Sequence, residues 1–191
     1  HPAYDYTYGI DVTKVGNDED ETGKLKTLEG VQFTLQEKDS NEFIKADGTT
    51  TTDKDGAILT TNNEGKINVV GLDEGTYILK EVTPAPGYNN SASNGVTFTI
   101  ARNALKQDGT EVIPDINSAN VTAAAGVVKA DSAVASTGKL SFTIVDKKGS
   151  GLPLTGLNGV TFTWIAGGAV LCIGVAHLIR SRKQAEESEQ E

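Results

Sequence analysis

Residues 71–88, GLDEGTYILKEVTPAPGY, contain the pattern that decides the fold. Tyr77, Leu79 and Glu81 are spaced two apart, so they share one face of an extended strand, in which successive side chains point to opposite faces. A Glu-Gly turn signal comes just before them. The pattern predicts a β-strand that places two apolar side chains in a core, followed by a carboxyl group.

Short alternating runs of this kind recur along the chain, with Gly, Asn and Asp between them, and no sustained helical period precedes residue 157. The acidic stretch 53–56, DKDG, lacks the third oxygen position and the distant glutamate of a calcium loop, so we predict an Asp-Gly hairpin turn there. Several short strands at this spacing predict an all-β sandwich or a partly open barrel. The predicted strands are 8–15, 30–37, 65–70, 76–82, 96–100 and 139–145.

The domain is predicted to cover residues 1–150, with a long insertion at about 101–138. Within the insertion, residues 115–138 are rich in small side chains and poor in turn residues. We expect a long connection or a weak extra strand there, with a short helix near Ala123.

Composition excludes several classes of function. The chain of 191 residues has a formal net charge of −9, which argues against a nucleic-acid partner because phosphate binding needs clustered Lys and Arg. The single cysteine, Cys172, cannot form an intrachain disulfide. No residue pattern predicts a metal ion or another cofactor. The sequence lacks Met and begins without a signal peptide, so we interpret it as the C-terminal part of a longer protein.

Residues 157–179 are almost uniformly apolar. As a helix they would span about 34 Å at 1.5 Å per residue, enough to cross a bilayer core of roughly 30 Å. Arg180, Arg182 and Lys183 follow at once, which predicts a cytoplasmic tail over residues 180–191 by the positive-inside rule. Everything before residue 157 is then expected outside the membrane.

A five-residue motif precedes the apolar run directly: Leu152, Pro153, Leu154, Thr155 and Gly156, within residues 151–156. Motif, apolar span and basic tail together resemble the LPXTG sorting signal of wall-anchored surface proteins of Gram-positive bacteria. The resemblance implies that a sortase cleaves between Thr155 and Gly156 and transfers the Thr carbonyl to an amine. That amine would belong to the peptidoglycan precursor or to a lysine of a neighbouring pilin subunit. A permanent membrane anchor behind a Pro-Gly linker is the alternative.

Three predicted strands end in an inward ionisable residue: Lys14, Glu81 and Asp146. Lys14 follows Ile10 and Val12 at a spacing of two, and Asp146 ends a similar apolar row. A single charge at a strand end usually reaches for solvent, and apolar residues also lie on the opposite faces. One amine and two carboxyls in comparable positions nevertheless suggest a joint role.

The hypothesis is a spontaneous isopeptide bond between Lys14 and Asp146, assisted by Glu81. Burial disfavours the charged forms, and a neutral amine is a competent nucleophile. A protonated Glu81 would hydrogen-bond the Asp146 carbonyl and relay protons while water leaves. By the loop-closure argument used for disulfides, the bond would stabilise the fold by on the order of 5 kcal/mol.

The segments VTKVG at 12–16, LEGVQFTLQEKD at 28–39 and residues 71–88 resemble the collagen-adhesin B-type domain of Gram-positive pilins. The last of these resembles that family's E-box, Tyr-x-Leu-x-Glu-Thr-x-Ala-Pro-x-Gly-Tyr, through Tyr77, Leu79, Glu81, Ala85, Pro86 and Tyr88. It departs from the pattern in having Val82 in place of the usual Thr and Gly87 directly after Pro86. The resemblance implies an Ig-like or prealbumin-like sandwich, with Lys14 and Glu81 at the family's cross-linking positions. The third partner is commonly an Asn on the last strand, where this sequence has Asp146; Asn103 is the reserve acceptor.

The leading functional hypothesis is a structural, wall-attached pilus subunit rather than an enzyme. Its expected partners are sortase, the acceptor amine, and the membrane before sorting. The alternative is the stalk domain of an adhesin that binds a host ligand through upstream domains. A wall-anchored enzyme with its catalytic domain upstream is the weakest hypothesis, since no residues here support catalysis on an external substrate.

Overall fold

The computed structural model describes residues 6–101, 121–136 and 138–149. Several sequence predictions concern residues outside these ranges: Asn103, the motif 152–156, the apolar run 157–179, and the basic residues Arg180, Arg182 and Lys183. Within the described ranges, no helix has the length and apolar character needed to cross a membrane.

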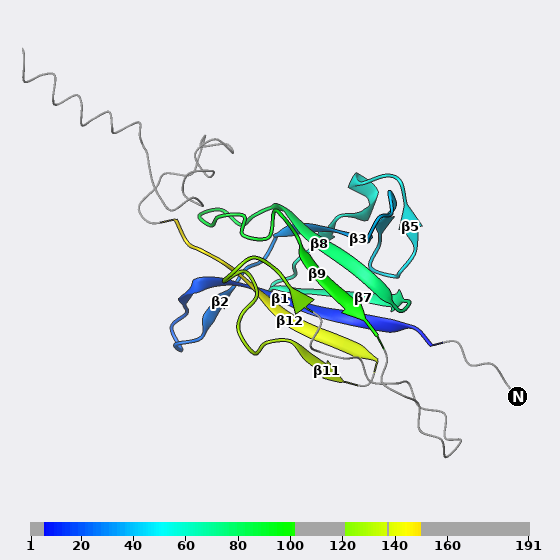
Figure 1. The fold of residues 1–191 in the computed structure, drawn as a ribbon. Coiled ribbons are helices and arrows are strands. Elements are labelled where there is room, and N and C mark those ends of the chain that lie inside the picture. Colours follow the sequence, from blue (N-terminus) through cyan, green and yellow to red (C-terminus); the bar gives the residue numbers. More distant parts are fainter. Residues whose placement is uncertain (1–5, 102–120, 137, 150–191) are drawn as a thin grey trace, which may run out of the picture.

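The first sheet is built around β1 (Tyr8–Glu19), which is the longest strand. On one side, β1 pairs in parallel with β12 (Lys139–Asp146), and β11 (Val134–Ser136) lies beyond it. On the other side, β7 (Lys66–Leu72) pairs with the first half of β1 and β2 (Leu25–Thr27) with the second half. Figure 1 shows these strands below the second sheet.

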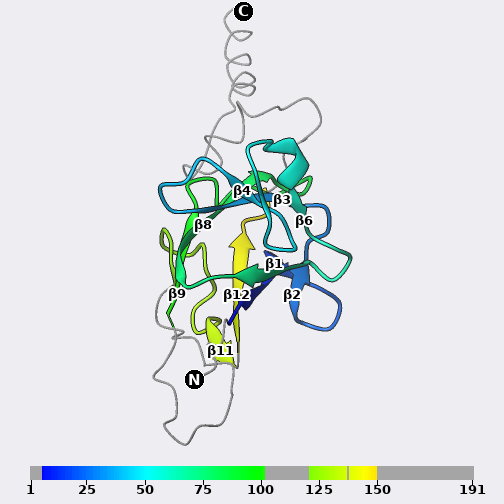
Figure 2. The same cartoon turned by 90° about the vertical axis from the view of Figure 1, so that its right-hand side faces the viewer.

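The second sheet has the order β10-β9-β8-β3-β6. β8 (Gly75–Thr83) lies at its centre, between β9 (Val96–Ile100) and β3 (Gln32–Glu37). The short strands β10 (Val121–Thr122) and β6 (Leu59–Thr60) form its edges. A separate hairpin of β4 (Phe43–Ile44) and β5 (Thr50–Thr51) and a 3₁₀ helix, η1 (Asp55–Ala57), lie beside it (Figures 1 and 2).

The two sheets enclose one apolar core, because their strands alternate buried and less buried residues. β9 and β12 show the alternation throughout. Phe98 of β9 stacks on Tyr77 at a centroid distance of 5.4 Å and meets Phe142 of the first sheet at 5.7 Å. The aromatic rings therefore join the two layers at the centre of the sandwich.

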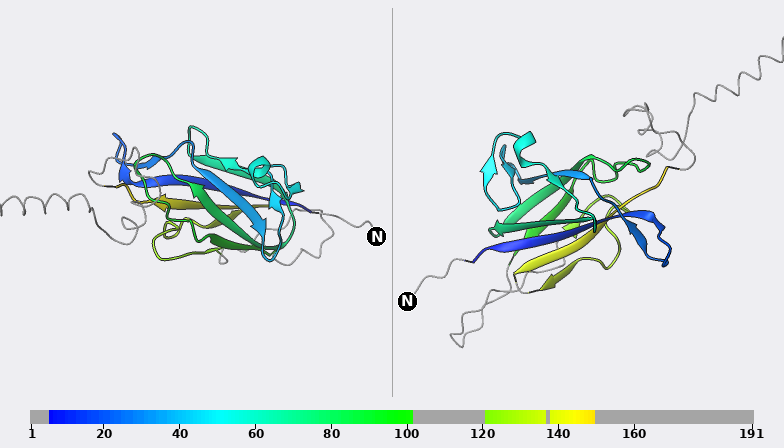
Figure 3. Two further views of the ribbon diagram at one scale, coloured as in Figure 1. Left: turned by 90° about the horizontal axis from the view of Figure 1, so that it is seen from above. Right: turned by 180° about the vertical axis from the view of Figure 1, so that it is seen from behind.

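β1 and β12, the first and last strands of the described domain, lie side by side and pair in parallel. In register, Val12 faces Phe142, Lys14 faces Ile144 and Gly16 faces Asp146. Figure 3 (right) shows the two strands, blue and yellow, running in the same direction. Because they are parallel, the chain enters β1 and leaves β12 at opposite ends of the sandwich.

All six strands predicted from alternation are present, and the all-β sandwich is confirmed. Residues 121–136 contain the short strands β10 and β11, so the expected weak extra strand exists, but the short helix near Ala123 is wrong, since turns follow β10. The hairpin predicted at residues 53–56 is also wrong. Asp55 and Gly56 lie in η1, and the flanking strands β5 and β6 pair with β4 and β3 instead of each other.

Candidate cross-linking site

Lys14, Glu81 and Asp146 come together inside the core. Lys14 Nζ lies 2.5 Å from Asp146 Oδ1 and 3.1 Å from Glu81 Oε1, and all three side chains are fully buried. The shorter distance is below the roughly 2.7–2.9 Å of a charge-assisted hydrogen bond. The three residues that the sequence singled out therefore occupy one site. The sequence left open which face of each strand points into the core, and the structure shows that the face with the ionisable residue does.

Strand register explains how Lys14 and Asp146 meet. Lys14 faces Ile144 and Asp146 faces Gly16, so the two side chains are diagonal neighbours on the same face of adjacent parallel strands. The backbone of Lys14 is held on both sides, because its N–H donates to Gly65 O at 2.7 Å and its carbonyl accepts from Leu28 N at 3.0 Å. The lysine is thus fixed at its Cα while its side chain extends into the core.

Glu81 reaches the site from the opposite sheet. It lies on β8, faces Phe33 of β3 in register, and follows the buried Tyr77 and Leu79 on the same face. Its backbone N–H donates to Ala92 O at 3.0 Å, where β8 leaves its pairing with β9. The Glu81 carboxyl of the second sheet therefore lies against the Lys14 amine of the first sheet.

The environment favours the neutral form of the Glu81 carboxyl. Burial is the largest influence and raises the pKa of Glu81 from 4.5 to about 8; the positive charge of Lys14 lowers it, and the negative charge of Asp146 raises it further. A carboxylic acid that stays protonated at neutral pH is suited to donate a proton.

Hydrogen bonding at the site is incomplete. Among the described residues, no group forms a hydrogen bond of good geometry with Lys14 Nζ, with either oxygen of Glu81, or with Asp146 Oδ2. Asp146 Oδ1 does accept one, from the backbone N–H of Ser91 at 3.1 Å. An ammonium group has three protons to donate, and leaving them unsatisfied in a core is costly. A buried ion pair is stable only when its charged groups make more hydrogen bonds than the amine and carboxyl groups make in this site.

The loop of residues 87–91 fastens the chain where it leaves β12. Asn89 N donates to Lys147 O at 2.9 Å and its Oδ1 accepts from Lys147 N at 2.7 Å, while Gly149 N donates to Gly87 O at 2.7 Å. Ser91 Oγ donates to Val145 O at 2.7 Å. We call residues 87–91 and their partners 145–149 the exit clamp. Its hydrogen bonds hold the residues directly before and after Asp146.

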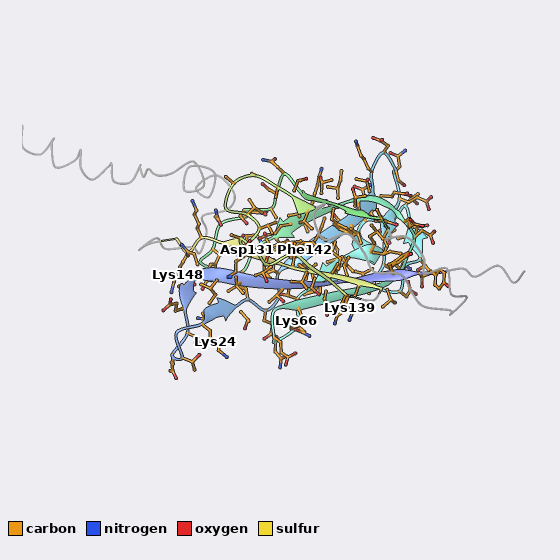
Figure 4. All side chains as sticks on the ribbon, turned by 60° about the horizontal axis from the view of Figure 1, so that its bottom comes forward. Lys24, Lys66, Asp131, Lys139, Phe142 and Lys148 are labelled. Atoms are coloured by element: carbon orange, nitrogen blue, oxygen red, sulfur yellow. The ribbon has the colours of Figure 1, made fainter. Side chains whose placement is uncertain are left out.

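A second cluster covers the clamp from outside. Tyr88 OH donates to Asp18 at 2.9 and 3.1 Å from the two carboxylate oxygens, and Lys148 Nζ lies 3.5 Å from Asp18 Oδ2. The Tyr88 ring also lies against Gly16, where a Cβ atom would come within 2.4 Å of it. Figure 4 shows Lys148 at the end of the molecule beyond β12 and Lys139 toward the other end. Tyr88 therefore closes the site at the position that faces Asp146 in register.

Sequence reasoning missed the clamp residues. Tyr88 ends the E-box pattern, so the pattern itself could have suggested that it belongs to the site. Ser91 contacts Asp146 through its backbone N–H, which every residue except proline carries, so no residue type indicates that contact. The reserve acceptor Asn103 and the sorting motif lie outside the described residues. In the described part of the chain, no three His, Cys, Asp or Glu side chains are grouped so as to hold a metal ion.

A sequence model of the SpaA prealbumin-like fold domain family matches residues 10–118, more than half of the chain. The chain belongs to this family. The match includes β1 with Lys14 and β8 with Glu81 and ends before β12. It confirms the resemblance to pilin B-type domains that the sequence indicated. Comparison with curated proteins gives no match.

Solved structures similar to this SpaA-family domain include three pilins. The backbone protein of pilus 2b from group B streptococcus is 20% identical with a TM-score of 0.46, over 75% of this chain and 42% of that one. The minor pilin of Streptococcus agalactiae is 25% identical with a TM-score of 0.48, over 77% and 47%. The shaft pilin SpaA of Lactobacillus rhamnosus GG is 19% identical with a TM-score of 0.42, over 78% and 50%. The chain thus spans half or less of these proteins.

Proposed function

We propose that this chain is a structural module of a pilus subunit, stabilised by an isopeptide bond between Lys14 and Asp146 that forms with the help of Glu81. The observation that carries the proposal is the buried site itself. An amine lies 2.5 Å from one carboxyl and 3.1 Å from a second, all without access to water. A covalent amide would remove two of these buried charges and the cost of burying them.

The reaction condenses one amine and one carboxylic acid. Transfer of a proton from the Lys14 ammonium group to Asp146 gives an amine and a carboxylic acid; the lone pair of Lys14 Nζ then attacks Cγ of Asp146, one carbon–oxygen bond breaks, and one water leaves. Glu81 gives its proton to the departing oxygen and takes one from the lysine nitrogen, so it ends as it began. Its pKa of about 8 keeps that proton available at neutral pH. Proximity replaces an external catalyst, because the reacting groups are held in contact by two adjacent strands.

Intact mass measurement of the purified protein tests the bond. We expect the wild-type protein to be lighter than its sequence mass by one water, and Lys14→Arg and Asp146→Ala to have their full masses. Glu81→Gln keeps the shape of the side chain but lacks the acidic proton, so it should also remain at full mass or react far more slowly. Fragmentation should assign the link to Lys14 and Asp146. A wild-type protein at full mass would overturn the proposal, and the loss of one ammonia would identify an Asn acceptor instead.

The place of this module at the cell surface is proposed from the sequence that follows it. The motif at residues 152–156 before an apolar run supports sorting by sortase, with Thr155 joined to the peptidoglycan precursor or to a lysine of a neighbouring subunit. Before sorting, the run would retain the chain in the membrane. Membership of the SpaA family supports a pilus role.

Cell fractionation tests the sorting proposal on the full-length protein. Thr155→Ala should leave the protein in the membrane fraction, whereas Thr163→Ala, in the apolar run, should not alter its attachment. Wall attachment of Thr155→Ala would contradict sorting at this motif. A pilus subunit should form SDS-resistant ladders of regularly increasing mass on immunoblots. One wall-linked species would instead identify the stalk of an adhesin.

A further inference from the structure

The Asp146 carboxyl is not symmetric in its surroundings. Oδ1 accepts a hydrogen bond of 3.1 Å from the backbone N–H of Ser91, whereas Oδ2 is buried and has no hydrogen-bond partner among the described residues. We propose that Ser91 N–H is the oxyanion donor of the cross-linking reaction. It would fix Oδ1 as the oxygen retained in the amide and Oδ2 as the oxygen that leaves as water. This inference rests on the proposed Lys14–Asp146 bond.

The turn that carries Ser91 is fastened on both sides of Asp146. Ser91 Oγ donates to Val145 O at 2.7 Å, one residue before Asp146. Asn89 exchanges two hydrogen bonds with Lys147, one residue after it. The N–H therefore has little freedom to move away from the carboxyl. A donor held in place before the reaction loses no energy to reorganisation when charge develops, which is the main advantage of an oxyanion hole.

The donor has a defined part in the balanced reaction. When the lone pair of Lys14 Nζ forms the bond to Cγ, the carbonyl electron pair moves onto Oδ1, whose negative charge Ser91 N–H stabilises. Oδ2 holds the proton first transferred from the Lys14 ammonium group, takes a second from Glu81 and departs as water, and Glu81 recovers a proton from the nitrogen. The electron pair on Oδ1 then restores the carbonyl. Glu81 and Ser91 finish unchanged, so no other reactant is needed.

The local geometry allows this N–H to be removed selectively. Ser93 N donates to Asn90 O at 3.4 Å, so Ser91 occupies the second position of a turn, where proline is favoured. Ser91→Pro removes both the N–H and the hydroxyl, and Ser91→Ala removes only the hydroxyl. Ser91→Ala is therefore the matched control for Ser91→Pro. Both variants lack the hydroxyl, but only Ser91→Ala keeps the backbone N–H that we propose as the donor.

The experiment follows cross-linking in time. The full-length chain, recovered in urea before it folds, is diluted into native buffer, and samples quenched with acid are weighed for the loss of one water. Ser91→Ala keeps the N–H but loses the Oγ contact with Val145, so we expect it to react somewhat more slowly than the wild-type protein. Ser91→Pro should react about 100-fold more slowly than Ser91→Ala, the usual cost of losing one oxyanion donor. Circular dichroism of the same samples reports whether the sandwich has formed.

A backbone ester separates loss of the donor from a folding defect. Replacing the amide at residue 91 by an ester with an alanine-like side chain removes the N–H without introducing a ring, and it is compared with Ser91→Ala. If the ester protein cross-links as fast as Ser91→Ala, the proposal is wrong. It is equally wrong if Ser91→Ala is as slow as the ester, since the hydroxyl would then be the essential group. A wild-type chain that never loses water would instead refute the isopeptide bond itself.

Discussion

At the residue scale, Lys14, Glu81 and Asp146 are explained better together than singly. Each would be costly in an apolar core on its own, because a buried charge needs partners and hydrogen bonds to offset lost hydration. Here each is at most 2% exposed, yet the hydrogen bonding among them is poor. The contacts are close but poorly hydrogen-bonded, and this combination supports the proposed bond over a structural ion pair.

The raised pKa of Glu81 predicts how an uncross-linked variant responds to pH. Lys14→Met cannot form the bond and removes the charge that lowers the pKa of Glu81, so this pKa, raised from 4.5 to about 8 in the folded wild-type protein, should stay raised in the folded variant. Between these values the folded protein binds more protons, so its free energy of unfolding should fall as pH rises from about 5 to 8, by a few kcal/mol. Urea unfolding at a series of pH values measures this.

The control for this experiment is the double variant Lys14→Met with Glu81→Gln. An amide side chain at position 81 does not titrate, so the dependence on pH should be markedly shallower in the double variant than in Lys14→Met alone. Equal slopes would show that Glu81 titrates normally and would remove the basis for its role as a proton donor.

The residues of the site differ in how far the sequence could reveal them. Lys14, Glu81 and Asp146 interrupt rows of apolar residues at a spacing of two, and that interruption is visible without a structure. The Ser91 donor and the Tyr88–Asp18 contact depend on how a loop folds back onto the end of β12. Such contacts join positions distant in sequence, and no local pattern encodes them.

At the element scale, strand length decided what could be predicted. The six strands found from alternation have five or more residues, which is enough to show a period of two. The remaining strands have two or three residues, too few to show that period. β2, β6, β10 and β11 each pair with a longer strand, whereas β4 and β5 pair with each other, and only a weak extra strand in the region of β10 and β11 was expected from the sequence. Pairing partners and the two sheets likewise follow from tertiary contacts, which alternation does not specify.

The parallel pairing of β1 and β12 is the element-level feature on which the site depends. A shift of one residue in register would turn Asp146 away from Lys14, because it would move the side chain to the other face. The register is fixed by the apolar rows of both strands and by the exit clamp at the end of β12. The core and the clamp thus hold Lys14 and Asp146 in the positions that the proposed bond requires.

At the scale of the whole molecule, the two ends of the chain pull on neighbouring parallel strands. Tension applied at the N-terminus and at the C-terminus would draw β1 and β12 past each other, which loads all their hydrogen bonds together. Hydrogen bonds alone yield to sufficient force. The proposed amide lies near the end of the paired region, so tension would pass along β1 to Lys14 and directly into Asp146, without loading the rest of the domain.

Single-molecule pulling on the protein, held by handles at both termini, tests this path. With the bond in place, the segment between Lys14 and Asp146 cannot extend, so the wild-type domain should show no large unfolding step. Lys14→Arg retains a positive charge but cannot form the bond, and its unfolding should release that segment, a length on the order of 400 Å at the reach of an extended chain. A step of that size in the wild-type protein would contradict a covalent link between the strands. A step in Lys14→Arg alone would show that the first and last strands are joined where tension enters and leaves the domain.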